Sequence, residues 1–506
     1  MADIAFTALM DVIQFQNLLA SLGGVLFGLF IGSTPGLTIS LGMVLMLPVT
    51  YSLPPVTSFC LLLGMFTAGM TGGSVSAILL NIPGTPSASA TAIDGHAMAK
   101  KGKAGEALGT AVTSSFAGGM LSLFALVLIS PLIAKVALKF GAPELAALVF
   151  LGLTLICSFG QKSMIKGLIS GALGLVFMTV GLDPIMGMPR FTFGVVALQS
   201  GISFLPVMIG LFAIPQIIEG LILGTNVIPN VQTKVTGVFR SINQVFKYMR
   251  YKIVAAILGI GVGAIPGAGG PIAVFLSYDY AKKIAPKDRK GKFGTGIPEG
   301  VCAPEAANNA MCGGAMIPMM TLGIPGDPIT AILLGALMVQ GLTPGPLLFR
   351  DNPQFVYSVF WAFLVAMVFV LFVTLATIRI WIRLLKVPKR MLLPIITVFC
   401  VVGTFSLRNS FTDTGIMIFF GLIGFLMKKY QFPLVPMLLA IVLGPTFERH
   451  VRTALVTSSG DPMIFLTKPI SLVFILIALI SFFTPIIRSI IANKKEKIRK
   501  KEHMFN

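Results

Sequence analysis

The chain has 506 residues, of which 55% are hydrophobic and only 11% are charged. A soluble domain carries about 25% charged residues, so this composition excludes a soluble globular protein. The formal net charge of +20 does not indicate nucleic-acid binding, because Lys100 is the first basic residue and the later ones fall in short loops and a C-terminal tail. We predict an all-α polytopic membrane protein with about 11–12 transmembrane segments.

The first broken element lies at residues 19–50, where an apolar stretch is interrupted at Pro35-Gly36. Each arm is too short for a helix that crosses a hydrocarbon core of about 30 Å, so we predict a re-entrant helical hairpin. The apolar segment 56–95 follows and contains an I-P-G-x-P motif at Pro83. Non-helical backbone cannot face lipid, so these breaks must line a cavity or be buried in protein.

The same two elements recur later in the chain. A second hairpin is predicted at 253–280 with its break at Pro266, and a second I-P-G-x-P motif lies at Pro325. The two proline landmarks are 48 residues apart in the first copy and 59 in the second, and the extra length matches the basic loop 282–292. Insertions belong in loops, so the pattern predicts one unit used twice.

The positive charges predict the sidedness of the two copies. The basic tail 493–506 is expected in the cytoplasm, and the N-terminus, which lacks basic residues, is expected outside. Counting spans between the basic loops places the ends of the first hairpin outside and those of the second inside. The copies are therefore predicted to be inverted repeats, a layout of secondary transporters in which the site lies at the repeat interface near the midplane.

The predicted breaks, spans and basic segments divide the chain into five parts. They are a first half at 1–224, a cytoplasmic-side link with the second hairpin at 225–300, the second I-P-G-x-P segment at 301–350, C-terminal scaffold helices at 351–492, and the basic tail at 493–506.

The broken stretches supply the candidate substrate-binding residues. Proline near a helix start and glycine without a side chain leave backbone N–H groups free for an anion, and free carbonyls at the preceding helix ends suit Na⁺. The alternative is that proline and glycine only kink the helices or let them pack closely. The candidates are Ser33, Thr34, Pro35, Gly36, Thr71, Gly72, Gly73, Ser74, Asn81, Pro83, Gly84, Thr85, Pro266, Gly267, Gly269, Gly270, Asn308, Asn309, Pro325 and Gly326.

Three residues are candidates for coupling to a cation or a proton, namely Glu305, Asp327 and Asn309. An ionisable residue inside a span is costly and points to function. The alternative for Glu305 is an acid at a loop end, or one paired with a basic loop residue such as Lys292. Asp327 lies in a turn, where capping is the favoured alternative.

No cofactor or metal site is predicted beyond co-transported Na⁺ or H⁺, because the Cys and His residues show no metal-ligand spacing. An enzyme is not predicted either, since the chain lacks G-x-S-x-G, H-E-x-x-H and P-loop motifs. No stretch is polar and long enough to form a nucleotide-binding domain, so an ion gradient or a partner must supply the energy for transport. A passive anion channel and a non-transporting membrane receptor for a binding protein remain as alternatives to a symporter.

Four stretches carry a resemblance to a known family. They are 72–109, which begins GGSVSAILLNIPGTP, 181–194 (GLDPIMGMPRFTFG), 201–214 (GISFLPVMIGLFAI) and 304–346, which includes MTLGIPGDP. In these stretches the chain resembles the TctA family, the large membrane subunit of tripartite tricarboxylate transporters. The resemblance extends over roughly residues 20–470 in the family's order. An aromatic residue would be expected where Met70-Thr71 and His96 stand, and these departures concern substrate detail only.

The resemblance implies a function and partners. The chain would be the permease subunit of a binding-protein-dependent secondary transporter in the bacterial inner membrane, taking up di- or tricarboxylates such as citrate with Na⁺ or H⁺. Its partners would be a small membrane subunit of the TctB type and an extracytoplasmic solute-binding protein of the TctC type. Alternating access would occur at the interface of the repeats, by an elevator-like movement if related systems are a guide.

Overall fold

The computed structural model describes residues 2–158, 164–183, 186–223, 245–384 and 389–484. Most of the predicted cytoplasmic link and the whole basic tail therefore lie outside the described residues. The chain forms two compact units, Met1–Leu138 with Leu205–Leu426, and Lys139–Phe204 with Met427–Asn506.

The first unit begins with the first copy of the predicted repeat, in which two breaks interrupt the helices. The elements in chain order are α1 (Ala2–Val12), α2 (Phe15–Ser33), α3 (Ile39–Tyr51), α4 (Pro55–Leu80), the 3-10 turn η1 (Pro86–Ala88), α5 (Ser89–Lys100) and α6 (Ala104–Ala137). The predicted hairpin is α2–α3, but α2 has 19 residues and is long enough to cross a membrane, so the prediction that both arms are too short is wrong for α2. The break at Pro83 separates α4 from η1 and α5.

The second copy lies in the same unit, and its two breaks fall between α11 and α12 and between α14 and α15. It comprises α11 (Met249–Gly263), α12 (Gly269–Ile284), α13 (Lys287–Lys290), α14 (Pro298–Leu322) and α15 (Pro328–Val339). The other helices of this unit are α10 (Phe204–Leu223), α16 (Pro346–Asp351), α17 (Pro353–Leu384), α18 (Lys389–Arg408) and α19 (Phe411–Lys429).

Glycine lets the hairpin of the first copy pack backbone to backbone against α4. A Cβ atom on Gly28 would lie 2.4 Å from the carbonyl oxygen of Met65, and one on Gly32 would lie 2.2 Å from that of Gly69. Real Cβ atoms do not approach a carbonyl so closely, so only glycine fits at either position. Small residues at helix contacts are how membrane helices pack without a hydrophobic driving force.

The second copy repeats this contact at equivalent positions. A Cβ on Gly259 would lie 2.4 Å from the carbonyl oxygen of Ala307, and one on Gly263 would lie 2.6 Å from that of Met311. Each pair of glycines is four residues apart and meets backbone positions four residues apart, as in α2 and α4. The repeated sequence therefore folds into a repeated helix contact.

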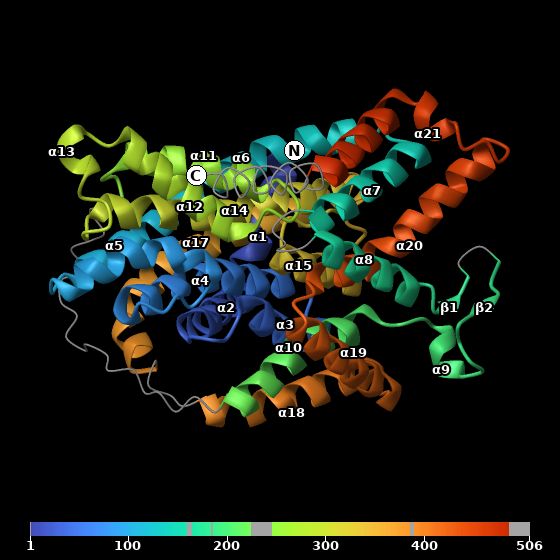
Figure 1. Cartoon of the computed structure of the whole chain (residues 1–506), viewed down its shortest axis with the longest axis horizontal. Helices are drawn as coiled ribbons and strands as arrows, with labels where there is room; N and C mark the ends of the chain where they lie inside the picture. Colours follow the sequence, from blue (N-terminus) through green and yellow to red (C-terminus); the bar gives the residue numbers. More distant parts are fainter. Residues whose placement is uncertain (1, 159–163, 184–185, 224–244, 385–388, 485–506) are drawn as a thin grey trace, which may run out of the picture. The chain divides into compact units, whose positions relative to one another are not determined.

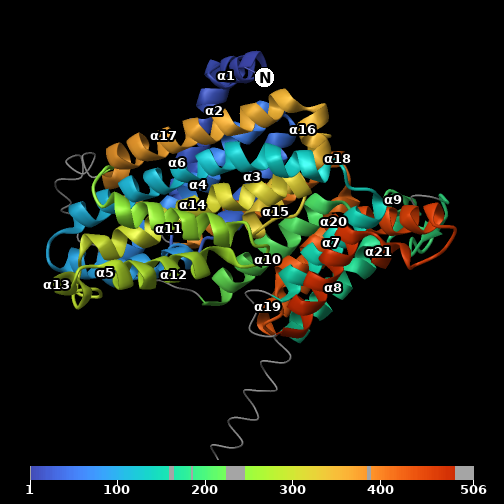
Figure 2. The same cartoon turned by 90° about the horizontal axis from the view of Figure 1, so that it is seen from above.

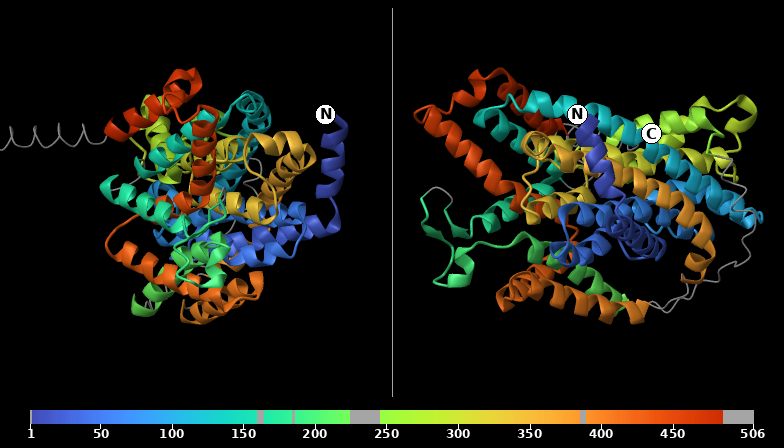
Figure 3. Two further views of the ribbon diagram at one scale, coloured as in Figure 1. Left: turned by 90° about the vertical axis from the view of Figure 1, so that its right-hand side faces the viewer. Right: turned by 180° about the vertical axis from the view of Figure 1, so that it is seen from behind.

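Successive layers of this unit run roughly side by side (Figure 2), from α17 through α6 and α14 to α11 and α12. On another side of the unit α10 lies against α18 (Figure 3), where Gly220 faces the side chain of Leu393. The helix α14 is thus covered on several sides, and its residues Glu299–Thr321 are buried. Such a helix inside a membrane protein is free to carry polar groups that lipid would not accept.

The second unit contains helices and one small hairpin of strands. Its elements are α7 (Ala142–Ser158), α8 (Met164–Met178), β1 (Gly181–Leu182), β2 (Pro189–Arg190), α9 (Val196–Gln199), α20 (Leu434–Thr457), α21 (Ile464–Thr467) and an apolar helix at Pro469–Thr484. The strands are antiparallel, with Gly181 opposite Arg190.

An ion-pair network holds this hairpin of strands against α20. Arg190 Nη1 lies 2.8 Å from Glu448 Oε1, and Arg452 Nη1 lies 2.8 Å from Asp183 Oδ2. Two basic and two acidic groups thus balance one another between this hairpin of strands and α20.

The structure agrees with the predicted fold class, an all-α polytopic membrane protein. Among the described residues, seven helices are long and apolar enough to cross a membrane, and α3, α7, α8 and α15 are among the shorter apolar helices. The predicted total of about 11–12 segments includes such short and broken helices. All four predicted breaks occur where Pro and Gly were expected to end a helix.

Candidate functional site

A buried polar face of the first unit belongs to α14 and carries one buried acid and two buried amides in the middle of the helix. Its residues Glu305, Asn308 and Asn309 are all 0% exposed. Their spacing of three and four residues places them on one face of the helix. This face meets α4, α5 and α6, which flank α14 in Figure 1.

Glu305 lies about two turns inside α14 and binds two hydroxyl groups. Its Oε1 accepts a hydrogen bond from Thr91 Oγ1 at 2.6 Å, and its Oε2 accepts one from Ser115 Oγ at 2.9 Å. It is therefore neither an acid at a loop end nor a partner of Lys292, which lies exposed before α14. A fully buried carboxylate held by hydroxyls alone is costly and points to a functional role.

The two asparagines contact α4 through their amide nitrogens. Asn308 Nδ2 donates to the carbonyl oxygen of Met70 at 3.1 Å, and Asn309 Nδ2 donates to Thr71 Oγ1 at 2.7 Å. Both orientations are fixed, because a carbonyl can only accept and Thr71 already donates its own hydrogen to Thr67.

The amide oxygens of both asparagines are left without a protein partner. Within the described part of the chain, Asn308 Oδ1 and Asn309 Oδ1 are buried and accept no hydrogen bond, and the same holds for Ser33 Oγ. Buried polar atoms are nearly always satisfied, so each such exception calls for a water, an ion or a function. The two amide oxygens belong to adjacent residues, three and four positions after Glu305 on the same buried helix.

Within each copy the two breaks lie against each other. A Cβ on Gly84 would lie 2.1 Å from the carbonyl oxygen of Gly32, and one on Gly326 would lie 2.5 Å from that of Gly263. The N–H of Gly267 also donates to the carbonyl oxygen of Gly326 at 2.8 Å. The paired motifs of the sequence are therefore joined in space.

The four helices that follow the breaks start in two different ways. Thr38 caps α3 by accepting from Leu41 N, and Asp327 caps α15 in a capping box with Thr330. The starts of α12 and of η1–α5 have no side-chain cap. These two uncapped starts meet each other, because a Cβ on Gly270 would lie 2.8 Å from the Cβ of Ser87.

Asp327 therefore has the local role that was the alternative to cation binding. Its Oδ1 accepts from Thr330 N at 2.7 Å and from Thr330 Oγ1 at 2.7 Å. Asn81 also has a local role, since it ends α4 in the left-handed conformation with φ 57° and its side chain is exposed. Asparagine tolerates this conformation better than most residues, which explains its presence there.

Most of the remaining candidate residues are buried, in the first copy as in the second. Buried candidates are Ser33, Thr34, Thr71, Gly72, Gly73, Ser74, Gly84, Thr85, Pro266, Gly270, Pro325 and Gly326. Partly buried are Pro35, Pro83, Gly267 and Gly269, and Gly36 is exposed.

Sequence reasoning missed Thr91 and Ser115, the two donors to Glu305. They are 214 and 190 residues from it in the chain. Thr91 lies in the stretch that carries the family resemblance, but neither residue has a spacing or motif that marks it. Among the described residues, no group of three or more His, Cys, Asp or Glu is placed to hold a metal ion.

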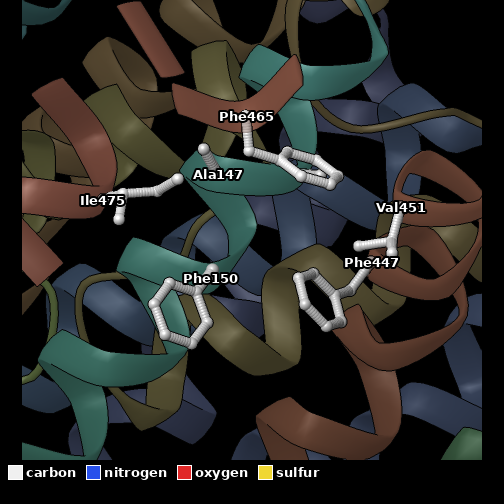
Figure 4. Close-up of a pocket in the computed structure, with 7 residues that line it drawn as sticks. Ala147, Phe150, Phe447, Val451, Phe465 and Ile475 are labelled. Carbon is white, nitrogen blue, oxygen red and sulfur yellow. The ribbon is translucent and has the colours of Figure 1, made fainter. Parts of the chain in front are cut away.

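A hollow in the second unit has a different character (Figure 4). It measures about 210 Å³ and is lined by Phe150, Phe447, Phe465 and aliphatic side chains of α7, α20 and the last helix. No polar surface lines it. A carboxylate would lose its hydration there without compensation, so this hollow does not suit a charged substrate.

Comparison with known proteins gives a consistent result. Residues 18–439 match the model of the tripartite tricarboxylate transporter TctA family. The chain is 37% identical over 481 residues, 94% of both chains, to an uncharacterized 52.8 kDa protein of the TAR-I ttuC′ 3′ region of Agrobacterium vitis. It is 35% identical over 231 residues, 45% of this chain and 95% of the relative, to an uncharacterized protein of the TAR-II ttuC′ 3′ region of the same organism. No solved structure matches the chain.

Proposed function

Because the chain belongs to the TctA family and is a multi-pass membrane component of a tripartite tricarboxylate transporter, we propose that it takes up di- or tricarboxylates by cation symport. The coupling cation is Na⁺ or H⁺, and access alternates at the interface of two inverted repeats. The chain works with a small TctB-type membrane subunit and an extracytoplasmic TctC-type binding protein. It resides in the bacterial inner membrane with its N-terminus outside and its C-terminus in the cytoplasm.

The observation that carries this proposal is that α14 carries, within five residues, a buried carboxylate and two buried amide oxygens that have no partner among the described residues. Asn308 Oδ1 and Asn309 Oδ1 are preoriented as acceptors, and Glu305 supplies a compensating negative charge. Oxygen atoms are the ligands that sites for hard cations use. A Na⁺ ion would satisfy the amide oxygens, whereas a proton would reside on Glu305 itself.

For the carboxylate we propose the junction of the two uncapped helix starts, near Gly270 and Ser87. Backbone N–H groups at a helix start favour an anion, and at α15 a carboxylate of the chain, Asp327, already occupies that position. The remaining free starts belong to α12 of the second copy and η1–α5 of the first. Substrate bound there would contact both copies, which favours alternating access at their interface.

The test is uptake of radiolabelled citrate into liposomes that contain the chain and its small subunit, with the binding protein supplied outside. Na⁺ and pH gradients are imposed separately. We expect accumulation above the outside concentration with at least one of them. Accumulation that ignores both gradients would contradict symport, equilibration without accumulation would indicate a channel, and binding-protein docking without uptake would indicate a receptor.

A further inference from the structure

A second buried carboxylate lies near the site and has no role in the mechanism proposed above. Asp94 on α5 is 0% exposed. Its Oδ1 accepts from the N–H of Gly296 at 2.7 Å and from that of Ile297 at 3.1 Å. The N–H of Gly294 lies 3.0 Å from both carboxylate oxygens, and Tyr278 Oη donates to Oδ2 at 2.7 Å.

All these donors belong to the second copy, while Asp94 belongs to the first. Ile297 is the N-cap of α14 and provides no side-chain cap of its own. Asp94 therefore supplies, from a distant helix, the negative charge that favours a helix start. Hydrogen bonds from N–H groups to a carboxylate are roughly twice as strong as neutral ones.

The surrounding backbone is shaped to fit this carboxylate. Gly294 and Gly296 have φ values of 87° and 96°, which favour glycine. A Cβ on Gly300, in the first turn of α14, would lie 2.0 Å from Asp94 Oδ2. The start of α14 thus closes around the carboxylate and leaves no room for a larger residue.

The same helix reaches the candidate cation site one turn earlier. Thr91 precedes Asp94 by three residues on α5 and donates to Glu305 Oε1 at 2.6 Å. The helix α5 therefore holds α14 at its start and again at Glu305. Two contacts along α5 fix the position of α14 relative to α5. They therefore also fix the position of Glu305 relative to its hydroxyl donors.

The helix α15 makes a corresponding contact in the opposite direction between the copies. Gln340, which ends α15, donates from Nε2 to the carbonyl oxygen of Thr50 at 2.7 Å and to Ser58 Oγ at 2.9 Å. These acceptors lie where α3 connects to α4, just as the donors to Asp94 lie where α12 connects to α14. In the first copy, α5 therefore binds the connection between α12 and α14 of the second copy. In the second copy, the end of α15 binds the connection between α3 and α4 of the first copy.

We propose that Asp94 is a positioning residue of the transporter, which sets the location of Glu305 by holding the start of α14. The proposal rests on the proposed function, because it gives Glu305 the coupling role. Asp94 itself touches neither the cation nor the substrate.

The first measurement is hydrogen exchange on the full-length protein, and it requires no transport. Asp94→Asn removes the charge from the acceptor, so we expect the amides of Gly294, Gly296 and Ile297 to exchange about tenfold faster than in the wild type, the equivalent of about 1.4 kcal/mol. The control is Asp279→Asn, an exposed carboxylate on α12 next to Tyr278, which should leave these amides unchanged. Equal rates in the wild type and Asp94→Asn, or equal acceleration in Asp279→Asn, would overturn the proposal.

The second measurement separates positioning from general stability. In uptake assays, Asp94→Asn should raise the half-saturating cation concentration about tenfold while the maximal rate changes less than threefold. A fall in maximal rate alone would mean that Asp94 serves stability only and would overturn the proposal. If Asp94→Asn does not fold, Tyr278→Phe removes one donor and should shift both readouts in the same direction. Amides could exchange faster in Asp94→Asn while the wild type transports no carboxylate. That result would refute the proposed function but would still confirm that Asp94 holds the start of α14.

Discussion

The two copies of the repeat share a backbone plan and differ in chemistry. Gly32 and Gly84 meet in the first copy as Gly263 and Gly326 do in the second. Yet the middle of α4 carries hydroxyls and glycines, whereas the middle of α14 carries a carboxylate and two amides. The two copies thus share close helix contacts and carry different polar side chains in the middle of these helices.

The helix starts differ in the same way. Thr85 and Asp327 occupy equivalent places, two residues after Pro83 and Pro325 respectively, but only Asp327 caps its helix. The helix start after the second break is therefore free of a side-chain cap in the first copy and capped by an acidic residue in the second. This difference shows that the two copies contribute different groups to the proposed site, in which the cation and anion positions remain those proposed above.

The largest expected effect comes from neutralising the second copy's carboxylate. Glu305→Gln should lower cation-driven uptake by about 100-fold, because two charge-assisted hydrogen bonds worth about 3 kcal/mol together are weakened. The measurement is the initial rate of uptake into liposomes. Glu106→Gln, at the partly exposed start of α6, is the matched control and should transport normally. Normal uptake by Glu305→Gln would show that the carboxylate of the second copy is not needed for transport.

The next effect should be the same in both copies, because it concerns the shared backbone. Gly84→Ala and Gly326→Ala should each lower stability by about 1–3 kcal/mol, since the added Cβ would overlap a carbonyl oxygen. Thermal unfolding in detergent measures this loss. Gly261→Ala is the control, because its Cβ would meet nothing within 4 Å. If either Gly84→Ala or Gly326→Ala were as stable as the control, the backbone equivalence of the copies would be wrong.

A smaller effect is expected where the copies touch through Asn309 and Thr71. Asn309→Leu should weaken cation activation about tenfold by removing an oxygen ligand, and Thr71→Val should weaken it less, by about 1 kcal/mol, by releasing the amide. The half-saturating Na⁺ concentration reports both changes. Thr67→Val on the same helix is the control for losing a buried hydroxyl. An unchanged half-saturation in Asn309→Leu would exclude the amide oxygen as a cation ligand.

The smallest effect tests whether Asp327 only caps α15. Asp327→Ala should cost about 1 kcal/mol of stability and leave the half-saturating cation concentration unchanged. Asp327→Ser restores a good cap and should recover that stability. If Asp327→Ser remained stable but lost coupling to the cation gradient, Asp327 would have a coupling role after all.

The sequence predicted the breaks well, because proline and glycine act on their own backbone. The interruptions at Pro35, Pro83, Pro266 and Pro325 all separate helices in the structure. Local rules also explain the contacts of two of the candidate residues. An asparagine or aspartate at a break can serve its own turn, and Asn81 and Asp327 do so.

The partners of the buried carboxylates could not be predicted in this way. Glu305 stood out because an acid in an apolar run is rare, but its donors Thr91 and Ser115 are ordinary residues in helices. Asp94 gave no signal, since an Asp beside a Gly before a basic loop resembles a solvated turn. Contacts between segments about 200 residues apart leave no local pattern, so the structure was needed to identify them.

The contact of Asp94 with the start of α14 also has a consequence for biogenesis. A chain made from its N-terminus presents Asp94 long before its donors, which are 184 to 203 residues further along. Until then the buried position of this carboxylate is not compensated, and the first copy cannot reach its final packing. Packing of α5 should therefore be completed late, after α12 and the start of α14 have been synthesised, and a ribosome-bound first half should remain open to proteases.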